Sequence, residues 1–540
     1  MRSVLSVSAG LTVVGMGTAC SSGRSTGSGG SGSTGTLIVA APSLKGLGQD
    51  YMTQLVYPSA TYWDAIFDYL VEQDESGNYI PGIATAWEAS ADKLTWAFDI
   101  RDGVVFHNGD PMSAEDVAFS YNRLLFDPAS RHAIKSRAEV VDSIKVDGKR
   151  MLLKTKTPQA DVPVWFAQSD GGVSGTVVSK KYFDAQGAAK ASAHPVGTGA
   201  YKFVSSSGED SVELAAFDDA KRGDWQKTRQ PKYSSVKVVA VSEESTRVSM
   251  LKSGQADAVP LTVSSIADVE SAGSGMRVVK TPSASYAGML FVGYTLNPKS
   301  PFNDKRIRQA LSIAIDRQAI TDSVYKGTAK PSGGFYGGPG SLGYPEDLEP
   351  PAFDSDQAKS LLSDAGFSGD MQILIKSDDT DFPDMSTLAE AIAGYYQKIG
   401  LSVKVNAMDS GALNDLQYAG KLPGQKANPA VSPATLYLRG FGNVVNVVPD
   451  QVTGYTSEGR PGRALWDYPE QEQKLKAIAA EFDADKQASM FADYYKWMAE
   501  QWNQVPLLAS DAVFGVSGKV AKWQPITSKP LVNSLHTMSG

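Results

Sequence analysis

Few residues in the sequence have the types and spacing that catalysis requires. The sequence has four histidines, His107, His132, His194 and His536. No two of them have the spacing of metal ligands on a helix or in a turn. The zinc-binding motif H-E-x-x-H and the phosphate-binding P-loop are both absent from the sequence. We therefore expect no metal and no cofactor, with a metal site assembled from distant segments as the alternative.

Matches to catalytic loops are equally poor. A G-x-S-x-G match at residues 23–27 lies in a Ser/Gly stretch, where no strand and helix can build the turn that exposes a nucleophilic serine. The stretch Gly334–Gly340 contains Pro339 and no lysine, which favours a loop over a phosphate cradle. The adjacent Asp378 and Asp379 are typical of a solvated surface. We expect no catalytic residue, and a secreted hydrolase is the alternative.

The single cysteine, Cys20, stands where an apolar run ends and a Ser/Gly stretch begins. Residues 1–19 have the composition of a signal peptide, with Arg2 followed by the apolar stretch Val4–Thr18. The residues just before the cysteine resemble the lipobox of bacterial lipoproteins, although Gly17 stands where that pattern prefers Leu. We expect cleavage before Cys20 and lipidation of its sulfur. A plain secretory signal followed by a free thiol is the alternative.

Residues 20–35 read as a tether behind that anchor. The range 21–35 is rich in Ser and Gly and has no apolar side chain that could pack on a folded body. A Gly/Ser chain of this length behaves as a random coil with an end-to-end distance of about 20 Å. Two acyl chains on one cysteine hold a protein stably at a membrane. The sequence thus predicts an extracytoplasmic lipoprotein on the outer face of the cell membrane, or a periplasmic protein.

Composition excludes other classes of protein. The 540 residues carry a formal net charge of −8 with Lys and Arg interspersed, so no concentrated basic patch is available for a nucleic acid. One cysteine cannot form a disulfide framework, and burial of apolar side chains must stabilise the fold. We expect a monomer that binds no nucleic acid.

The first elements expected in the folded part of the chain are strands. Residues 37–40 are a short apolar strand candidate, and in residues 94–100 apolar side chains alternate as in a half-buried strand. Ser113, with Asp116 three residues later, predicts the first turn of a helix. That helix ends before the Asp-Pro pair at 127–128.

A second helix is expected after Asn303 or Asp304. Its apolar stripe consists of Ile307, Ala310, Leu311, Ala314 and Ile315. Three arginines are predicted to point away from that stripe: Arg306, Arg308 and Arg317.

Alternating helices and strands follow in the second half. A helix is predicted from Asp354 or Ser355 to Gly366, then a strand over 371–375, a helix over 388–399 and a strand over 401–405. Strand, helix and strand in this order imply a right-handed parallel crossover within an α/β lobe.

Five stretches in order are similar to the extracytoplasmic solute-binding proteins of peptide, nickel and opine ABC importers, the family of large oligopeptide- and dipeptide-binding proteins. They are GIATAWEASADKLTWAFDIRDGVVFHNGDPMSAEDVAFSYNRLL at 82–125, PVGTGAYKF at 195–203, STRVSMLKSGQADAV at 245–259, FNDKRIRQALSIAIDR at 302–317 and DQAKSLLSDAGF at 356–367. The chain is identified on these motifs as a member of that family.

The resemblance implies an α/β, two-lobed periplasmic-binding-protein-like fold whose hinge has two chain crossings. Lobe one would consist of residues 36–283, with an inserted subdomain at about 52–181. Lobe two would consist of residues 284–507. Residues 508–540 would return to lobe one. A solute would bind between the closing lobes. The partners would be the permease subunits of an ABC importer with their cytoplasmic ATPases. A surface adhesin or chaperone is a further alternative.

The expected ligand site lies in lobe two. Peptide-binding members carry an acidic residue in a stretch that corresponds here to RGFGNVVNVVPDQ, residues 439–451, where Asn443 or Asn446 takes its place. An amide cannot neutralise a buried ammonium, so a neutral, sugar-like or anionic solute is favoured over an ordinary short peptide. Arg439 would pair with a carboxylate. Aromatic candidates for contact with the solute are Trp165, Tyr286, Tyr437 and Phe441, with core or hinge packing as the alternative for each.

Overall fold

The computed structural model describes most of the chain after residue 32. The described residues are 33–50, 62–74, 78–130, 137–167, 175–217, 229–273, 275–292, 294, 297–334, 338, 341–377, 382–409, 412–413, 434–442, 469–523 and 538–540. Cys20 and residues 20–32 of the predicted tether lie outside them, whereas residues 33–35 belong to the first strand, Ser33–Ala41, so the tether ends earlier than the sequence predicts.

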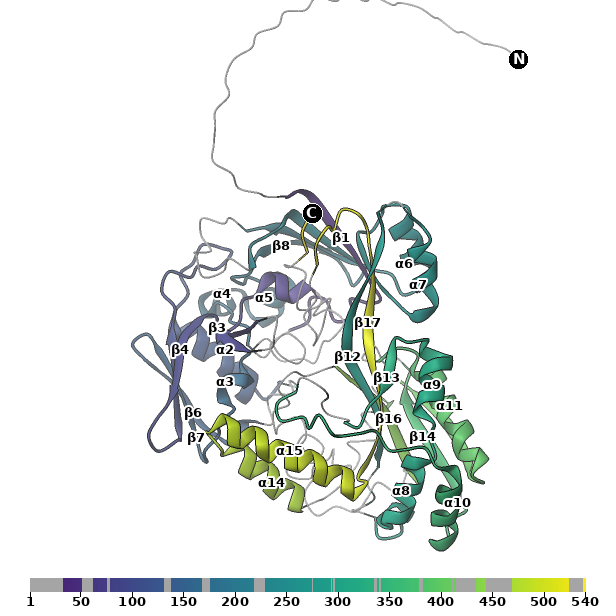
Figure 1. Cartoon of the computed structure of the whole chain (residues 1–540). Coiled ribbons are helices and arrows are strands. Elements are labelled where there is room, and N and C mark those ends of the chain that lie inside the picture. Colours follow the sequence, from purple (N-terminus) through teal and green to yellow (C-terminus); the bar gives the residue numbers. More distant parts are fainter. Residues whose placement is uncertain are drawn as a thin grey trace, which may run out of the picture. The chain divides into compact units, whose positions relative to one another are not determined.

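One large sheet organises the described part of the chain (Figure 1). Its strand order is β15-β14-β16-β12-β17-β11-β1-β10-β9-β8, and β13 pairs with β17. The strands are β1 (Ser33–Ala41), β8 (Tyr201–Ser207), β9 (Ser211–Ala216), β10 (Tyr233–Ala240), β11 (Ala258–Leu261), β12 (Arg277–Phe291), β13 (Ala329–Pro331), β14 (Asp370–Lys376), β15 (Ser402–Met408), β16 (Thr435–Gly442) and β17 (Gln504–Val516).

Two smaller sheets precede β8 in the sequence. They consist of β2 (Val71–Gln73) with β3 (Tyr79–Pro81), and of β4 (Ala84–Ala89), β5 (Thr95–Ile100), β7 (Arg150–Thr155) and β6 (Val141–Asp147) in that spatial order. The strand predicted over 94–100 is β5, and its Trp96 and Phe98 are buried as the alternation requires.

Helices flank these sheets. They are α1 (Trp63–Ile66), α2 (Ala114–Phe126), α3 (Val162–Trp165), α4 (Lys180–Gln186), α5 (Ala188–Ala193), α6 (Glu244–Lys252), α7 (Ile266–Glu270), α8 (Lys305–Ile313), α9 (Arg317–Ile320), α10 (Ser355–Asp364), α11 (Met385–Lys398), α14 (Pro469–Ala479) and α15 (Ala484–Gln501). No helix in the described part of the chain is both long and apolar enough to cross a membrane.

Local signals in the sequence placed several helix ends correctly. The Asp116 carboxylate accepts the backbone N–H of Ser113 at 2.9 Å, so the predicted capping box starts α2. Asp354 caps α10 by accepting the N–H of Gln357 at 2.8 Å. Gly366, with φ of +65°, follows the end of that helix.

The parallel strand pair of the predicted α/β crossover is also confirmed. Strands β14 and β15 pair in parallel from Asp370↔Ser402 to Lys376↔Met408, and α11 connects them. Figure 1 shows α8, α10 and α11 on one face of this part of the sheet.

The three arginines near α8 do not share one environment. Arg306 is exposed and pairs with Asp304, but Arg308 and Arg317 are buried. Arg308 donates to the carbonyls of Phe302, Asn303, Gln501 and Trp502, and Arg317 to those of Ser312, Ile315, Pro351 and Pro506. Backbone carbonyls replace water around both guanidinium groups, which allows a charge on a helix to face inward.

Two large hydrophobic cores lie along the sheet. The first includes α2, β5 and β7 together with β1, β8 and β10, and the second includes α8, α11, α15 and β14. Strands β12 and β17 each contribute residues to both cores. Val279 and Ala512 pack against the first core, whereas Ala287 and Leu508 belong to the second. Their antiparallel register shifts between Thr281 and Ser285.

Candidate functional site

The candidate residues of β12 and β16 share one face of the sheet. In the antiparallel register Tyr286 is opposite Phe441, Gly288 is opposite Arg439, and Leu290 is opposite Tyr437. Directly opposed residues project on the same side, and so do alternate residues along a strand. The side chains of Tyr286, Arg439 and Tyr437 therefore start from one surface, which we call the β12–β16 face. Gly288 has no side chain opposite Arg439.

Burial differs along this face. Tyr286 is 1% exposed and Tyr437 is 4% exposed, whereas Arg439 is half-buried. The Tyr286 hydroxyl lies against Gly338, where an added Cβ would come within 1.8 Å of the hydroxyl oxygen. Burial raises the pKa of Tyr286, so its phenol stays protonated and can donate a hydrogen bond.

Further tyrosines near Tyr286 were not predicted. The rings of Tyr344 and Tyr495 meet edge to face at a centroid distance of 5.5 Å, and α15 supplies Tyr495. The hydroxyls of Tyr286 and Tyr495 are buried without a partner at hydrogen-bond geometry. Only the three-dimensional structure brings these residues together, since about 60 to 210 positions separate them in the sequence.

Trp165 lies in a different environment from the other candidates. It ends α3 in the first core, whereas Tyr437 belongs to the second. The guanidinium of Arg137 stacks on its ring at 4.6 Å and forms an ion pair with Asp161 at 2.9 Å. For Phe441 only the backbone in β16 is described, and Asn443 and Asn446 lie outside the described residues.

The histidines in the described ranges have structural partners. Both ring nitrogens of His107 are occupied, because Nδ1 faces the N–H of Gly197 at 3.3 Å and Nε2 faces the carbonyl of Gly199 at 3.0 Å. This arrangement defines the neutral Nε2–H tautomer. His194 packs on Phe203. Within the described ranges no three His, Cys, Asp or Glu side chains could hold a metal ion together.

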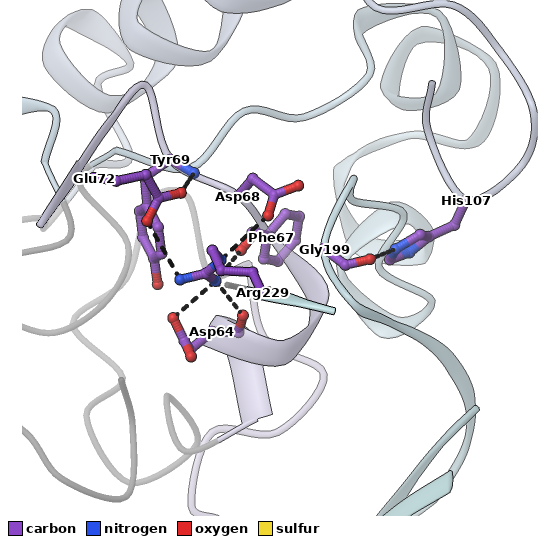
Figure 2. A network of polar contacts seen from close by, with 8 residues as sticks. All are labelled: Asp64, Phe67, Asp68, Tyr69, Glu72, His107, Gly199 and Arg229. Carbon is purple, nitrogen blue, oxygen red and sulfur yellow. Dashed lines mark hydrogen bonds and ion pairs between the residues drawn. The ribbon is translucent and has the colours of Figure 1, made fainter. Parts of the chain in front are cut away.

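The buried carboxylates of Asp64, Asp68 and Glu72 surround Arg229 in an ion cluster (Figure 2). Arg229 forms ion pairs with Asp64, Asp68 and Glu72 at 3.0, 3.3 and 3.3 Å. Burial raises the pKa of the Glu72 carboxyl from 4.5 to about 7, against the opposing effect of Arg229. The guanidinium also donates to the carbonyls of Asp64 and Phe67. Since the arginine ties α1 and β2 to the segment before β10, we assign this cluster a structural role.

Comparison with known proteins agrees with these observations. Residues 78–426 match the family described as bacterial extracellular solute-binding proteins, family 5 Middle. The chain therefore belongs to that family, whose members are binding proteins and not enzymes.

Relatives in this family bind different solutes. The chain is 26% identical over 368 residues to the glutathione-binding protein GsiB of Pectobacterium atrosepticum, covering 67% of this chain and 66% of the relative. It is 26% identical over 386 residues to the dipeptide-binding protein of Escherichia coli, covering 65% of this chain and 68% of the relative. The matched region thus spans about two thirds of each relative's length, slightly less than two thirds for GsiB and slightly more for the dipeptide-binding protein.

A solved structure supports the fold over almost the whole chain. The binding protein AgaA from A. tumefacien R10, in complex with agropinic acid, superimposes with a TM-score of 0.73 at 20% identity. The alignment covers 93% of this chain and 98% of AgaA. The predicted two-lobed periplasmic-binding-protein fold is thereby confirmed.

Proposed function

We propose that this protein is the extracytoplasmic receptor of an ABC importer, which binds a solute between two closing lobes and delivers it to the permease. Family membership supports the receptor role. The observation that carries the site is the β12–β16 face, where a cation and aromatic rings start from β16 and from β12, the strand that pairs with β17. We place the hinge where β12 and β17 pass between the two cores.

The solute that best fits this face carries a carboxylate or a similar anionic group. Arg439 supplies a planar guanidinium that can bind a carboxylate through two parallel hydrogen bonds. Tyr286 and Tyr437 can offer ring faces and phenol groups to apolar or sugar-like parts of the same molecule. Glutathione and agropinic acid, named for two of the similar proteins, both contain carboxylates. A peptide-like or opine-like solute is therefore our proposal.

We further propose that the mature chain starts at a lipidated Cys20 and stays monomeric on the outer face of the membrane. The signal-peptide pattern, the single cysteine and the Gly/Ser tether support the lipid anchor.

Purification of the protein from its producing cells, followed by denaturation and mass spectrometry of released small molecules, tests the receptor function. One solute at near-stoichiometric amount is expected, and titration calorimetry with that compound should show a single site without turnover. Conversion of the compound to a product would contradict the proposal. So would a denatured sample that releases macromolecules but no small molecule.

A further inference from the structure

The corner between α14 and α15 reaches from the second core to the first. The buried side chains of these two helices, such as Leu475 and Phe491, belong to the second core. Phe482, which stands between the helices, packs instead against the first core. Its ring stacks on Trp96 of β5 with a centroid distance of 5.9 Å and an interplanar angle of 15°.

Two more interactions join the same surfaces. The ammonium of Lys93 lies 4.7 Å from the centre of the Phe482 ring, as a cation–π pair. The backbone N–H of Ala160 donates to the carbonyl of Ala479 at 2.7 Å. We call these five residues, Lys93, Trp96, Ala160, Ala479 and Phe482, the Phe482 contact. Figure 1 shows α14 and α15 reaching the sheet that contains β6 and β7.

The corner that presents Phe482 has hydrogen bonds of its own. Gln487 donates from Nε2 to the carbonyls of Ile478 and Glu481 at 3.0 and 3.1 Å, which ties the end of α14 to α15. Asp483 caps α15 by accepting the N–H of Lys486 at 2.9 Å. The entropy cost of docking this aromatic side chain is therefore low.

The opposite surface is also held in place. The Trp96 indole donates from Nε1 to the carbonyl of Gln159 at 2.8 Å, which fixes the orientation of its ring. Lys93 occupies the turn between β4 and β5 with φ of +61°, in the left-handed region that is unfavourable for lysine. Glycine would fit that turn without strain, whereas the lysine supplies the cation that lies over the Phe482 ring.

We propose that the Phe482 contact is a latch that holds the two lobes closed and sets the fraction of closed protein before any solute binds. This inference rests on the proposed division into lobes, in which residues 52–181 belong to lobe one and 284–507 to lobe two. Opening the lobes then requires Phe482 to leave Trp96. Together the stacking and the cation–π pair shift the ratio of open to closed protein about tenfold, or about 1.4 kcal/mol.

Hydrogen exchange of the solute-free protein tests the latch through the Ala160 amide. In Phe482→Ala this amide should exchange about tenfold faster than in the wild type, while the amides of β7 keep their wild-type rates. Small-angle scattering should show a larger radius of gyration. Phe353→Ala removes an aromatic ring that is 46% exposed elsewhere and is the matched control, with no change in either measurement.

A second variant separates the latch from general loss of stability. Lys93→Gly removes the cation and relieves the left-handed backbone, so the melting temperature should not fall while exchange at Ala160 still accelerates. Wild-type exchange at Ala160 and an unchanged radius of gyration in Phe482→Ala would overturn the latch, as would equally accelerated exchange in β7. Neither result depends on the solute, so the receptor function is judged separately.

Discussion

The buried ion cluster around Arg229 makes a quantitative prediction about pH. Glu72 is 6% exposed, and this burial raises the pKa of its carboxyl from 4.5 to about 7 in the folded protein. Because the folded state holds this proton more tightly, the associated stability is fully present below pH 4.5 and is lost as the pH rises through 7. A shift of this size corresponds to about 3 kcal/mol between those limits.

Glu72→Gln removes the titration and keeps the shape of the side chain. The arginine still has two carboxylates in the variant, Asp64 and Asp68, so Arg229 does not become an unpaired buried charge. Relative to the wild type, the variant should therefore gain about 3 kcal/mol in the free energy of unfolding as the pH rises from 4 to 8.

Urea unfolding of both proteins across this pH range, followed by circular dichroism, measures the difference. Glu88→Gln, which removes an exposed carboxylate paired with Arg150, is the control and should change stability by less than about 1 kcal/mol at every pH. A difference between Glu72→Gln and the wild type that stays constant with pH would refute the reasoning, since Glu72 would then titrate alike in both states.

Three further predictions concern the anchor, the second core and the solute. Cys20→Ser should release the protein from membranes and abolish fatty-acid labelling, and unchanged membrane fractionation would exclude an acyl anchor. Leu311→Ala, at a fully buried position of α8, should cost about 2–5 kcal/mol in urea unfolding without changing solute affinity; abolished binding at normal stability would reverse that assignment. In calorimetry Phe441→Ala should weaken binding by removing stacking and apolar contact, whereas Arg439→Ala should weaken it only for a solute with a carboxylate or similar anion; wild-type affinity in both would rule out the β12–β16 face.

Patterns with a short range in the sequence predicted the structure well. The capping box at Ser113, the cap at Asp354 and the strand–helix–strand order around α11 all depend on neighbours within a few residues or on one periodicity. The alternation around Trp96 also placed that side chain in the core. The family motifs supplied the fold that these local signals could not define.

Features that depend on distant residues escaped prediction. Arg308 and Arg317 are charged residues next to an apolar stripe, and part of what makes their burial favourable is carbonyls almost 200 positions away, such as that of Pro506. The partners of Arg229 are likewise about 160 positions upstream. The same limit applies to the site, because Tyr344 and Tyr495 meet through a loop and a helix whose packing no local pattern encodes.

The place of β17 in the large sheet has a consequence for the timing of folding. This strand is near the end of the chain, yet it lies between β11 and β12 and pairs with both. During synthesis the sheet stays divided, with two unsatisfied edges, until residues 504–516 become available. Such long-range pairing forms slowly. The strand made last is thus the one that completes the native sheet.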